Sequence, residues 1–264
     1  MKSGATREFP MPQYMAAWET FRAVSDENLA TAEYLLSSPS WPKATSPTIC
    51  DIGCADGQLV GALLKSPHLR NRVSEVRLVD PNIEWLEKAA DRIENSRLAD
   101  SVRTFPCAFQ DVWPKCATGS DVILAVHMVY LISEKELEQL VLHRPTASTL
   151  YVILDAPDSV FTELWSITAK KYHARVVKAH QLLQQWSKSA PGLGNRIRAK
   201  LPREYLFDHD YSDWLLTILC YKSMHTLKNI RRWEKPVKEI LERRTDRSGK
   251  FVECQSICYE FPSE

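Results

Sequence analysis

Apolar and polar positions along the chain follow two different periods. Between about residues 48 and 155, short apolar runs alternate with amphipathic stretches of helical period. This order is typical of parallel strands joined by crossover helices. Ser133 and Glu136 have the spacing of a capping box and predict the start of one such helix. The expected strands, each a short apolar run, cover 48–52, 75–80, 102–106, 121–126 and 149–155.

The two ends of the chain differ from this central block. Residues about 10–38 have apolar positions near helical spacing, and a stretch with three prolines follows them. Beyond 155 the pattern is helix-rich, and the tail GKFVECQSICYEF alternates like a final strand. We therefore expect an N-terminal helical lid and linker at 1–47. The rest, 48–264, is expected to be one α/β domain with a helical insertion at about 158–230.

Composition narrows the class of protein. The 264 residues are 44% hydrophobic and carry a net charge of +1, which fits a packed core and argues against a surface that coats nucleic acid. No apolar run approaches the roughly 18 residues of a membrane span, and the first residues lack a signal-peptide core. We expect neither a nucleic-acid nor a membrane partner.

Cysteine usage bears on compartment and metal binding. Seven scattered cysteines are an odd number without a CxxC pair, so we expect reduced thiols and a cytoplasmic protein. Cys254 and Cys258 share one face of the last strand, but no histidine or second cysteine pair stands near them in the sequence. We therefore expect no metal site.

The loop after the first strand, DIGCADGQL, is the first candidate for binding. Gly53 and Gly57 permit a sharp turn and a close approach of a ligand to the backbone, although Ala55 occupies the middle position of a GxGxG pattern. A tight strand-to-helix turn without a ligand would use the same glycines. Asp51 at the strand end suits a ligand amine better than a pyrophosphate.

Asp80 ends the second strand and is followed by Pro81. A carboxylate at this tip can accept hydrogen bonds from both ribose hydroxyls of an adenosine group. The alternative is an N-cap for the following helix. Together with the glycine loop, Asp80 indicates an adenosyl ligand.

These motifs resemble class I S-adenosylmethionine-dependent methyltransferases: DIGCADG, LVDPN and SDVILAVHMVYLI match motifs of that family. The resemblance implies S-adenosylmethionine as cofactor. It also implies a Rossmann-like, mostly parallel seven-stranded sheet with helices on both faces and an N-terminal helical lid. Several runs, including QYMAAWETFRAVSDEN and DSVFTELWSITAKKY, are more specifically similar to histamine N-methyltransferases. That narrower resemblance implies a small-molecule acceptor, an amine.

Carried over by position, the resemblance implies a set of cofactor contacts. The residues expected around the methionine and ribose parts are Asp51, Gly53, Asp80 and Pro81. Those expected beside the adenine are Gln110 and Asp111. Those expected to flank the reacting sulfonium, where the fourth strand ends, are Val126 and His127.

For the acceptor, the resemblance implies Glu27 as the carboxylate that holds the amine and Gln255 as a further contact. Tyr14 and Tyr130 are our candidates from the sequence for an aromatic pocket that attracts cations. Glu27 could equally be a solvated carboxylate in a polar SDEN run. His127 stands where the family relative has an amide, and it is our candidate general base, with a rate that falls near an ordinary histidine pKa of about 6.5.

The sequence leaves two other functions open. An enzyme of this fold can consume S-adenosylmethionine without methylating, by closing its amino-acid part into azetidine-2-carboxylate and releasing methylthioadenosine. A protein can also hold the cofactor without turnover. Asp51 near the amine is compatible with methyl transfer and with cyclisation alike.

Overall fold

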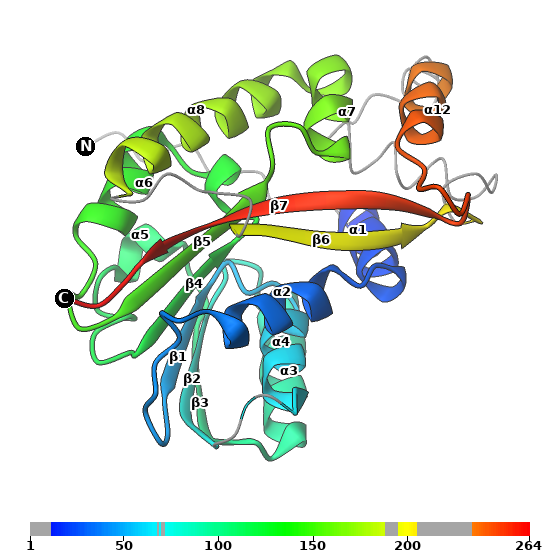
Figure 1. Ribbon diagram of the computed structural model, residues 1–264. Coiled ribbons are helices and arrows are strands. Elements are labelled where there is room, and N and C mark those ends of the chain that lie inside the picture. The colour runs from blue at the N-terminus through cyan, green and yellow to red at the C-terminus, as the bar shows by residue number, and fades with distance from the viewer. Residues whose placement is uncertain (1–11, 68, 70–71, 188–194, 205–233) are drawn as a thin grey trace.

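A single seven-stranded sheet organises the chain in the computed structural model, which describes residues 12–67, 69, 72–187, 195–204 and 234–264. The strand order is β3-β2-β1-β4-β5-β7-β6 (Figure 1). The strands are β1 (Thr48–Ile52), β2 (Val73–Val79), β3 (Ala99–Phe105), β4 (Val122–Val126), β5 (Thr149–Asp155), β6 (Arg196–Pro202) and β7 (Phe251–Phe261).

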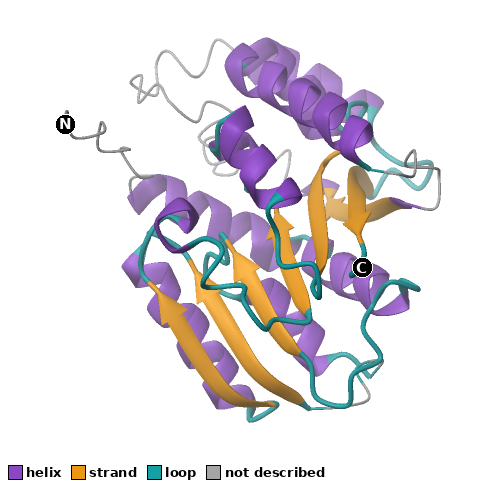
Figure 2. Ribbon diagram, turned by 90° about the vertical axis from the view of Figure 1, so that its left-hand side faces the viewer, coloured by secondary structure: helices purple, strands orange, loops and turns teal. Residues whose placement is uncertain are grey.

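The first five strands are parallel, and β7 runs antiparallel to both β5 and β6. The carboxyl ends of β1 to β5 therefore meet at one edge of the sheet (Figure 2). The mostly parallel seven-stranded sheet is confirmed. The bounds of β1 and β5 are as predicted, whereas β2 and β3 begin earlier, and the sequence analysis missed β6 inside the expected helical insertion.

Helices cover both faces of the sheet, as expected. Apolar residues of α2, α3 and α4 form one core, and those of α6, α7 and α8 belong to a second core across the sheet (Figure 1). The helices are α1 (Pro12–Val24), α2 (Glu27–Ser37), α3 (Gln58–Lys65), α4 (Ile83–Ser96), α5 (Phe109–Val112), α6 (Glu134–Leu142), α7 (Val160–Thr168), α8 (Lys170–Trp186) and α12 (Glu234–Arg243), with a 3-10 turn η1 (Val129–Leu131).

The N-terminal segment is two helices rather than one, because the chain breaks at Ser25 and Asp26. Asp26 is fixed to the edge strand β6: its N–H donates to Lys200 O at 3.3 Å, and its carboxylate accepts from Lys200 N. This contact anchors the first residue of α2, Glu27, against the sheet.

Two local expectations about helix starts are resolved. The capping box of Ser133 and Glu136 is present at the start of α6. Asn82 caps α4, since its side chain accepts from Trp85 N at 3.0 Å. Asp80 is therefore not the N-cap, and its carboxylate has another role.

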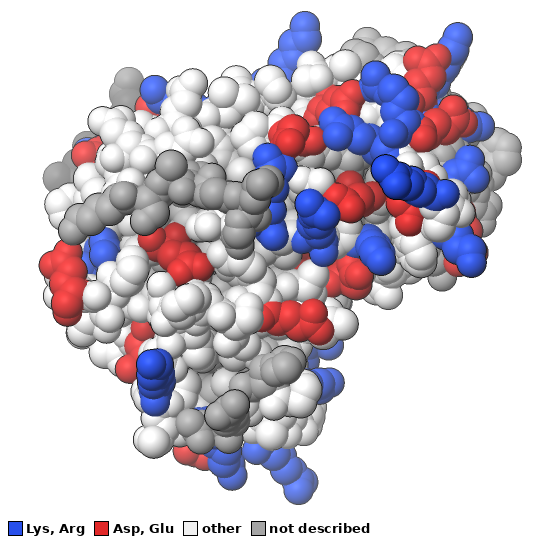
Figure 3. Space-filling model, in the orientation of Figure 1, with Lys and Arg blue, Asp and Glu red and all other residues white. Residues whose placement is uncertain are grey.

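Three surface and compartment expectations can be compared with the described part of the chain. It contains no helix that is long and apolar enough to cross a bilayer. The six cysteines within it are free. Positive and negative side chains are interspersed over the side that holds α7, α12 and the β6–β7 pair (Figure 3), where Arg243 and Arg244 both pair with Glu163.

Candidate functional site

The loop between β1 and α3 turns through three left-handed residues. Gly53, Ala55 and Gly57 have φ angles of 73°, 48° and 71°. A Cβ on Gly53 would lie 3.0 Å from Met128 Cβ, and one on Gly57 would lie 2.8 Å from Ala89 Cβ. Glycine is therefore required at both positions by packing as well as by conformation. Ala55 adopts a conformation that costs an L-residue about 1 kcal/mol or more, so its surroundings must hold it there.

Asp80 supplies that restraint from the end of β2. Its Oδ2 accepts from Ala55 N at 3.0 Å, and its Oδ1 accepts from Asn82 N at 2.8 Å. Each carboxylate oxygen has room for a second hydrogen bond. Asp80 thus shapes the glycine loop and can still accept from a ligand.

Asp51 lies beside this loop at the end of β1 and is 3% exposed. Burial, followed by the charge of Asp80, raises the pKa of Asp51 to about 7. Burial also raises the pKa of Asp80, against the opposing hydrogen bonds from Asn82 and Ala55. Among the described residues, none forms an ion pair with either carboxylate. This part of the edge therefore has excess negative charge.

His127 follows β4 and is held between two carboxylates that the chain brings from distant positions. Its Nε2 lies 3.2 Å from Glu27 Oε1, and its Nδ1 lies 3.5 Å from Asp155 Oδ2. The residue has a φ of 53°, and its N–H donates to Ile153 O at 2.8 Å. A left-handed histidine at a strand end is a strained placement of the kind that clusters at functional sites. The contact with Glu27 has an ion-pair distance but not the alignment of a hydrogen bond, and the buried Nε2 has no hydrogen-bond partner in the described part of the chain.

The two carboxylates control the charge of His127. Burial alone would lower the pKa of His127, but the charge of Glu27 and the contacts with Asp155 outweigh it and raise the pKa to about 10. Burial likewise opposes ionisation of Glu27, yet the charge of His127 and then that of Arg22 hold the pKa of Glu27 below its ordinary value. At neutral pH the ring is therefore an imidazolium, which replaces the expectation of a titration near an ordinary histidine pKa.

Arg22 reaches this region from α1. Its Nη1 lies 3.4 Å from Asp56 Oδ1, and its guanidinium carbon lies 5.1 Å from the centre of the Trp85 ring. Its Nε and Nη2 are buried and have no hydrogen-bond partner among the described residues. Because its charge acts on both Asp80 and Glu27, Arg22 stands between the two groups of carboxylates. Two unsatisfied buried donors are costly and suit an anionic group of a ligand.

The remaining residues expected at the cofactor fall into two groups. Pro81 and Val126 are half-buried and directly adjoin Asp80 and His127. Gln110 instead donates to Glu136 Oε1 at 2.5 Å, and its own Oε1 is buried without a partner among the described residues. Asp111 is exposed. Their role beside an adenine stays a prediction.

The residues expected at the acceptor are not all brought together. Glu27 meets His127, as described above. Gln255 points elsewhere, since its Oε1 accepts from Arg196 at 2.6 Å and its Nε2 donates to Glu253. Its neighbour in β7, Cys254, is the residue whose surroundings include Glu27 and Asp155. The side chain of Tyr14, in α1, lies outside the described residues.

Tyr130 lies in a packed aromatic cluster next to His127. Its ring centre is 6.5 Å from that of His127 and 5.3 Å from that of Trp165, which in turn lies 6.2 Å from Phe161. Tyr130 is 6% exposed and Trp165 is 4% exposed. The cluster forms an apolar wall beside the histidine rather than an open aromatic cage.

Sequence reasoning missed Asp155 and Arg22. Asp155 ends the apolar strand TLYVILD, which is the same signal that identified Asp51 and Asp80 at the ends of their strands. That signal was available and was not applied to the fifth strand. Arg22 gives no comparable signal, because its position depends on how α1 packs.

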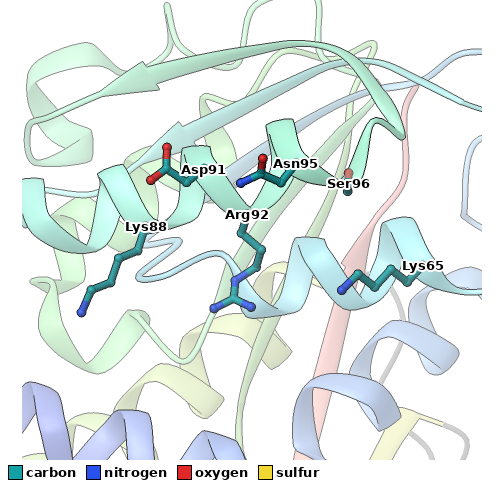
Figure 4. Close-up of a pocket in the computed structure, with 6 residues that line it drawn as sticks. All are labelled: Lys65, Lys88, Asp91, Arg92, Asn95 and Ser96. Atoms are coloured by element: carbon teal, nitrogen blue, oxygen red, sulfur yellow. The ribbon is translucent and has the colours of Figure 1, made fainter.

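A surface pocket of about 480 Å³ lies away from this site, between α3 and α4 (Figure 4). It is lined by Lys65, Lys88, Asp91, Arg92, Asn95 and Ser96. Lys88 already pairs with Glu19, and Arg92 pairs with Asp56. None of the residues expected at the cofactor or the acceptor lines it, and we do not assign the site to it.

Comparison with known proteins supports the architecture. The sequence matches no protein-family model and no curated protein. Among solved structures, the chain is similar to an S-adenosylmethionine-dependent methyltransferase from Geobacter sulfurreducens in complex with S-adenosyl-L-homocysteine, with a TM-score of 0.54 and 10% identity over 96% of this chain and 98% of that one. It is also similar to YcgJ from Bacillus subtilis, with a TM-score of 0.50 and 14% identity over 90% of this chain and 98% of that one. These likenesses show the Rossmann-like fold found in methyltransferases, and none of them concerns the narrower resemblance to histamine N-methyltransferases.

Proposed function

We propose that the protein is an S-adenosylmethionine-dependent methyltransferase whose acceptor is a small-molecule amine. The observation that carries this proposal is the placement of His127. Its left-handed backbone sets the ring at the end of β4, next in order to the glycine loop of β1, with Glu27 and Asp155 on its two nitrogens. A cofactor cradle and a proton-handling group thus adjoin each other at one edge of the sheet.

The residues of the cradle fit the charges of the cofactor. When bound, S-adenosylmethionine supplies a methyl group on a positively charged sulfonium, together with an ammonium and a carboxylate. Asp51, buried and short of counter-charge, is suited to the ammonium. The free Nε and Nη2 of Arg22 are suited to the carboxylate. The second acceptor positions of Asp80 are suited to the ribose hydroxyls.

Burial of the second group of residues supports a small acceptor. The side chains of Glu27 and His127 are only 14% and 18% exposed, and the wall of Tyr130 and Trp165 adjoins them. A polymer would need these groups on an open surface. A compact acceptor with one reacting nitrogen can reach them and leave water outside.

An amine is favoured because of the charge that it carries before reaction. An ammonium group beside Glu27 competes with the imidazolium of His127 for the same carboxylate, so its binding lowers the pKa of His127. The ring then releases its Nε2 proton to solvent as the acceptor enters, and becomes a neutral base. Nε2, which has no hydrogen-bond partner among the described residues, is then the atom that takes a proton from the ammonium and so leaves its nitrogen a lone pair for attack.

Methyl transfer then balances simply. The acceptor nitrogen would form a bond to the methyl carbon that the bound cofactor supplies, and the carbon–sulfur bond would break with its electron pair remaining on sulfur. The proton that the nitrogen gives up goes to His127 Nε2. The chain contributes alignment, exclusion of water and this proton acceptor, effects that together are worth several kcal/mol of barrier.

A product assay tests the proposal. The purified protein is incubated with S-adenosylmethionine and a panel of amines and phenols, and mass spectrometry follows both cofactor products and acceptors. We expect S-adenosylhomocysteine in equal amount to a methylated amine, with phenols unreactive. His127→Ala, which removes the imidazole, is the comparison variant and should produce far less of both.

Two outcomes would contradict the methyltransferase itself, and a third would contradict only the amine acceptor. Release of methylthioadenosine would indicate cyclisation or lysis of the cofactor, and binding without any product across the panel would indicate a protein that only holds it. Methylation confined to phenols would retain the methyltransferase and overturn the amine.

A further inference from the structure

Helix α8 contacts the backbone of Asp155, the residue whose carboxylate lies against His127. His180, in α8, is 3% exposed, and its Nε2 lies 2.8 Å from the backbone oxygen of Asp155. Its Nδ1 lies 2.8 Å from the hydroxyl of Tyr259 in β7. Three buried groups, Tyr259, His180 and Asp155, are thus joined in series behind His127.

The chemistry of the partners fixes the tautomer of His180. A backbone carbonyl only accepts hydrogen bonds, so Nε2 must carry the proton and donate it to Asp155 O. Nδ1 then accepts from the Tyr259 hydroxyl, which is the donor of that pair. His180 is therefore neutral, and burial, which lowers its pKa, keeps it so. The charged groups that act on it are Asp155, Asp158 and Arg196.

Asp155 is restrained at three points. Its carbonyl accepts from His180, its Oδ1 accepts from Ser159 Oγ at 3.4 Å, and its Oδ2 lies 3.5 Å from His127 Nδ1. The two side-chain contacts are long. The short contact to the backbone is therefore the firmest of the three, and together with the bond that Ala156 N donates to Gln255 O at 2.8 Å it holds the last peptide group of β5, from which the carboxylate extends.

We propose that His180 and Tyr259 are positioning residues that hold Asp155 against His127 and so orient the ring that faces the acceptor. Without the donor of His180, the carbonyl of Asp155 would be buried and unpaired, which costs about 1–3 kcal/mol and drives the strand end to rotate toward another partner. The carboxylate would then leave Nδ1 of His127. The role in turnover rests on the proposed function, whereas the coupling to His127 does not.

Nitrogen-15 NMR of the histidines in the full-length protein tests the coupling directly. The groups that face His127 are Glu27 from α2, Asp155 from β5, Cys254 from β7 and the ring of Tyr130 from η1. In the wild-type protein we expect His180 as a fixed Nε2–H tautomer between about pH 6 and pH 8. A mixture of tautomers or an imidazolium at this position would overturn the assignment.

Tyr259→Phe removes only the hydroxyl that fixes Nδ1. We expect the pH midpoint of His127 to fall by about half a unit, less than in His180→Leu, because His180 keeps its bond to Asp155 O but loses the partner that fixes its ring. Tyr151→Phe is the matched control: Tyr151 is also fully buried in the sheet, but its ring lies 6.1 Å from that of Trp41, in the other core. The control should leave the His127 midpoint unchanged.

His180→Gln supplies a second variant, because an amide can donate to Asp155 O and accept from Tyr259. It should retain more of the wild-type His127 midpoint than His180→Leu, which can do neither. If Tyr259→Phe and His180→Leu both leave the midpoint within about 0.2 units of wild type, the positioning role is wrong. A shifted midpoint without any methylated product would instead count against the proposed function alone.

Discussion

The buried carboxylates at the carboxyl edge of the parallel strands are compensated differently in its two halves. Over β1 and β2, Asp51 and Asp80 have raised pKa values, and the described residues form no ion pair with either of them. Over β4 and β5, Glu27 and Asp155 flank His127, whose positive charge compensates theirs. One half is left with excess negative charge, and the other is neutralised within the chain.

This difference in charge compensation indicates which kind of ligand each half can bind. A negative, unpaired site gains most from a ligand that brings its own positive charge, as a sulfonium with an ammonium does. A neutralised site binds a cation only by exchange, when the incoming charge displaces the proton of His127. The first half is therefore suited to binding a cationic ligand, and under the proposed function the second is suited to a proton transfer during turnover.

Replacing His127 gives the largest expected effect and tests the second half. We expect His127→Ala to lower turnover by about 10²–10⁴-fold with little change in cofactor affinity, since the proton acceptor is lost and the glycine loop is not. Steady-state kinetics and calorimetry measure the two quantities. A large loss of cofactor affinity would show that His127 belongs to the cofactor site, and the two halves would then not differ in what they bind.

The pH profile sharpens the same point. Because the pKa of His127 is raised to about 10, the fraction of neutral ring rises with pH over the whole neutral range. The specificity constant should therefore rise between about pH 6 and pH 9, without levelling near 6.5. Glu27→Gln removes one carboxylate and should move the rise to lower pH. A wild-type profile that is flat above pH 7 would show that His127 is neutral there.

The sequence predicted the first half well because that half is local. The DIGCADG loop and Asp80 belong to two consecutive strand–loop–helix units, and parallel pairing of β1 with β2 brings them together without further information. The fold follows from the same periodic pattern. Only Ala55, left-handed without being glycine, needed the structure to explain it, through its bond to Asp80.

The second half is assembled from segments far apart in the chain, and less of it could be predicted from the sequence. Glu27 was predicted from resemblance, but its contact with His127 depends on Asp26 binding the edge strand β6, which no pattern indicated. Gln255 was expected at the acceptor and instead contacts Arg196, because residues of a strand alternate between its faces and Cys254 faces the site. Long-range packing decides such contacts.

Replacing Asp80 tests the first half, with the next largest effect. We expect Asp80→Ala to weaken cofactor binding by tenfold or more, since two charged hydrogen bonds to the ligand are lost and the restraint on Ala55 with them, a cost of roughly 1.5–3 kcal/mol. Calorimetry measures the affinity. Asp80→Asn keeps one acceptor oxygen, and its cofactor affinity should lie between those of the wild-type protein and Asp80→Ala. Unchanged affinity in a folded Asp80→Ala protein would remove this residue from the cofactor site.

Replacing Arg22 tests whether the residue between the two halves binds the cofactor, and we expect a smaller loss of affinity than for Asp80. Arg22→Met keeps the apolar stem against Trp85 and removes the donors, so we expect cofactor affinity to fall by about fivefold to tenfold. Arg72→Met, just before the amino-terminal end of β2, removes an exposed cation that pairs with Asp100 and is the control. Equal cofactor affinities in both variants would show that the buried donors of Arg22 do not bind the cofactor carboxylate.

The smallest effect, a change in stability with pH, tests the excess charge of the first half without any ligand. The folded-state pKa of Asp51, about 7, is above its ordinary value near 3.8, so the folded protein binds this proton more tightly than the unfolded one. The free energy of unfolding of the wild-type protein should therefore fall as pH rises from about 4 to about 7. Above that range the buried, ionised carboxylate should keep it at the lower value. Asp51→Asn cannot ionise. We expect its Tm to exceed that of wild type by more at pH 8 than at pH 5, and the difference to be at least about 2–4 °C, the shift that about 1 kcal/mol produces in a chain of this size. Asp91→Asn, which alters an exposed carboxylate of α4, should show no such difference between the two pH values. If Asp51→Asn and wild type differ equally at pH 5 and pH 8, Asp51 is ionised and compensated in the folded chain. The first half would then resemble the second, and the cofactor would have no unpaired charge to satisfy there.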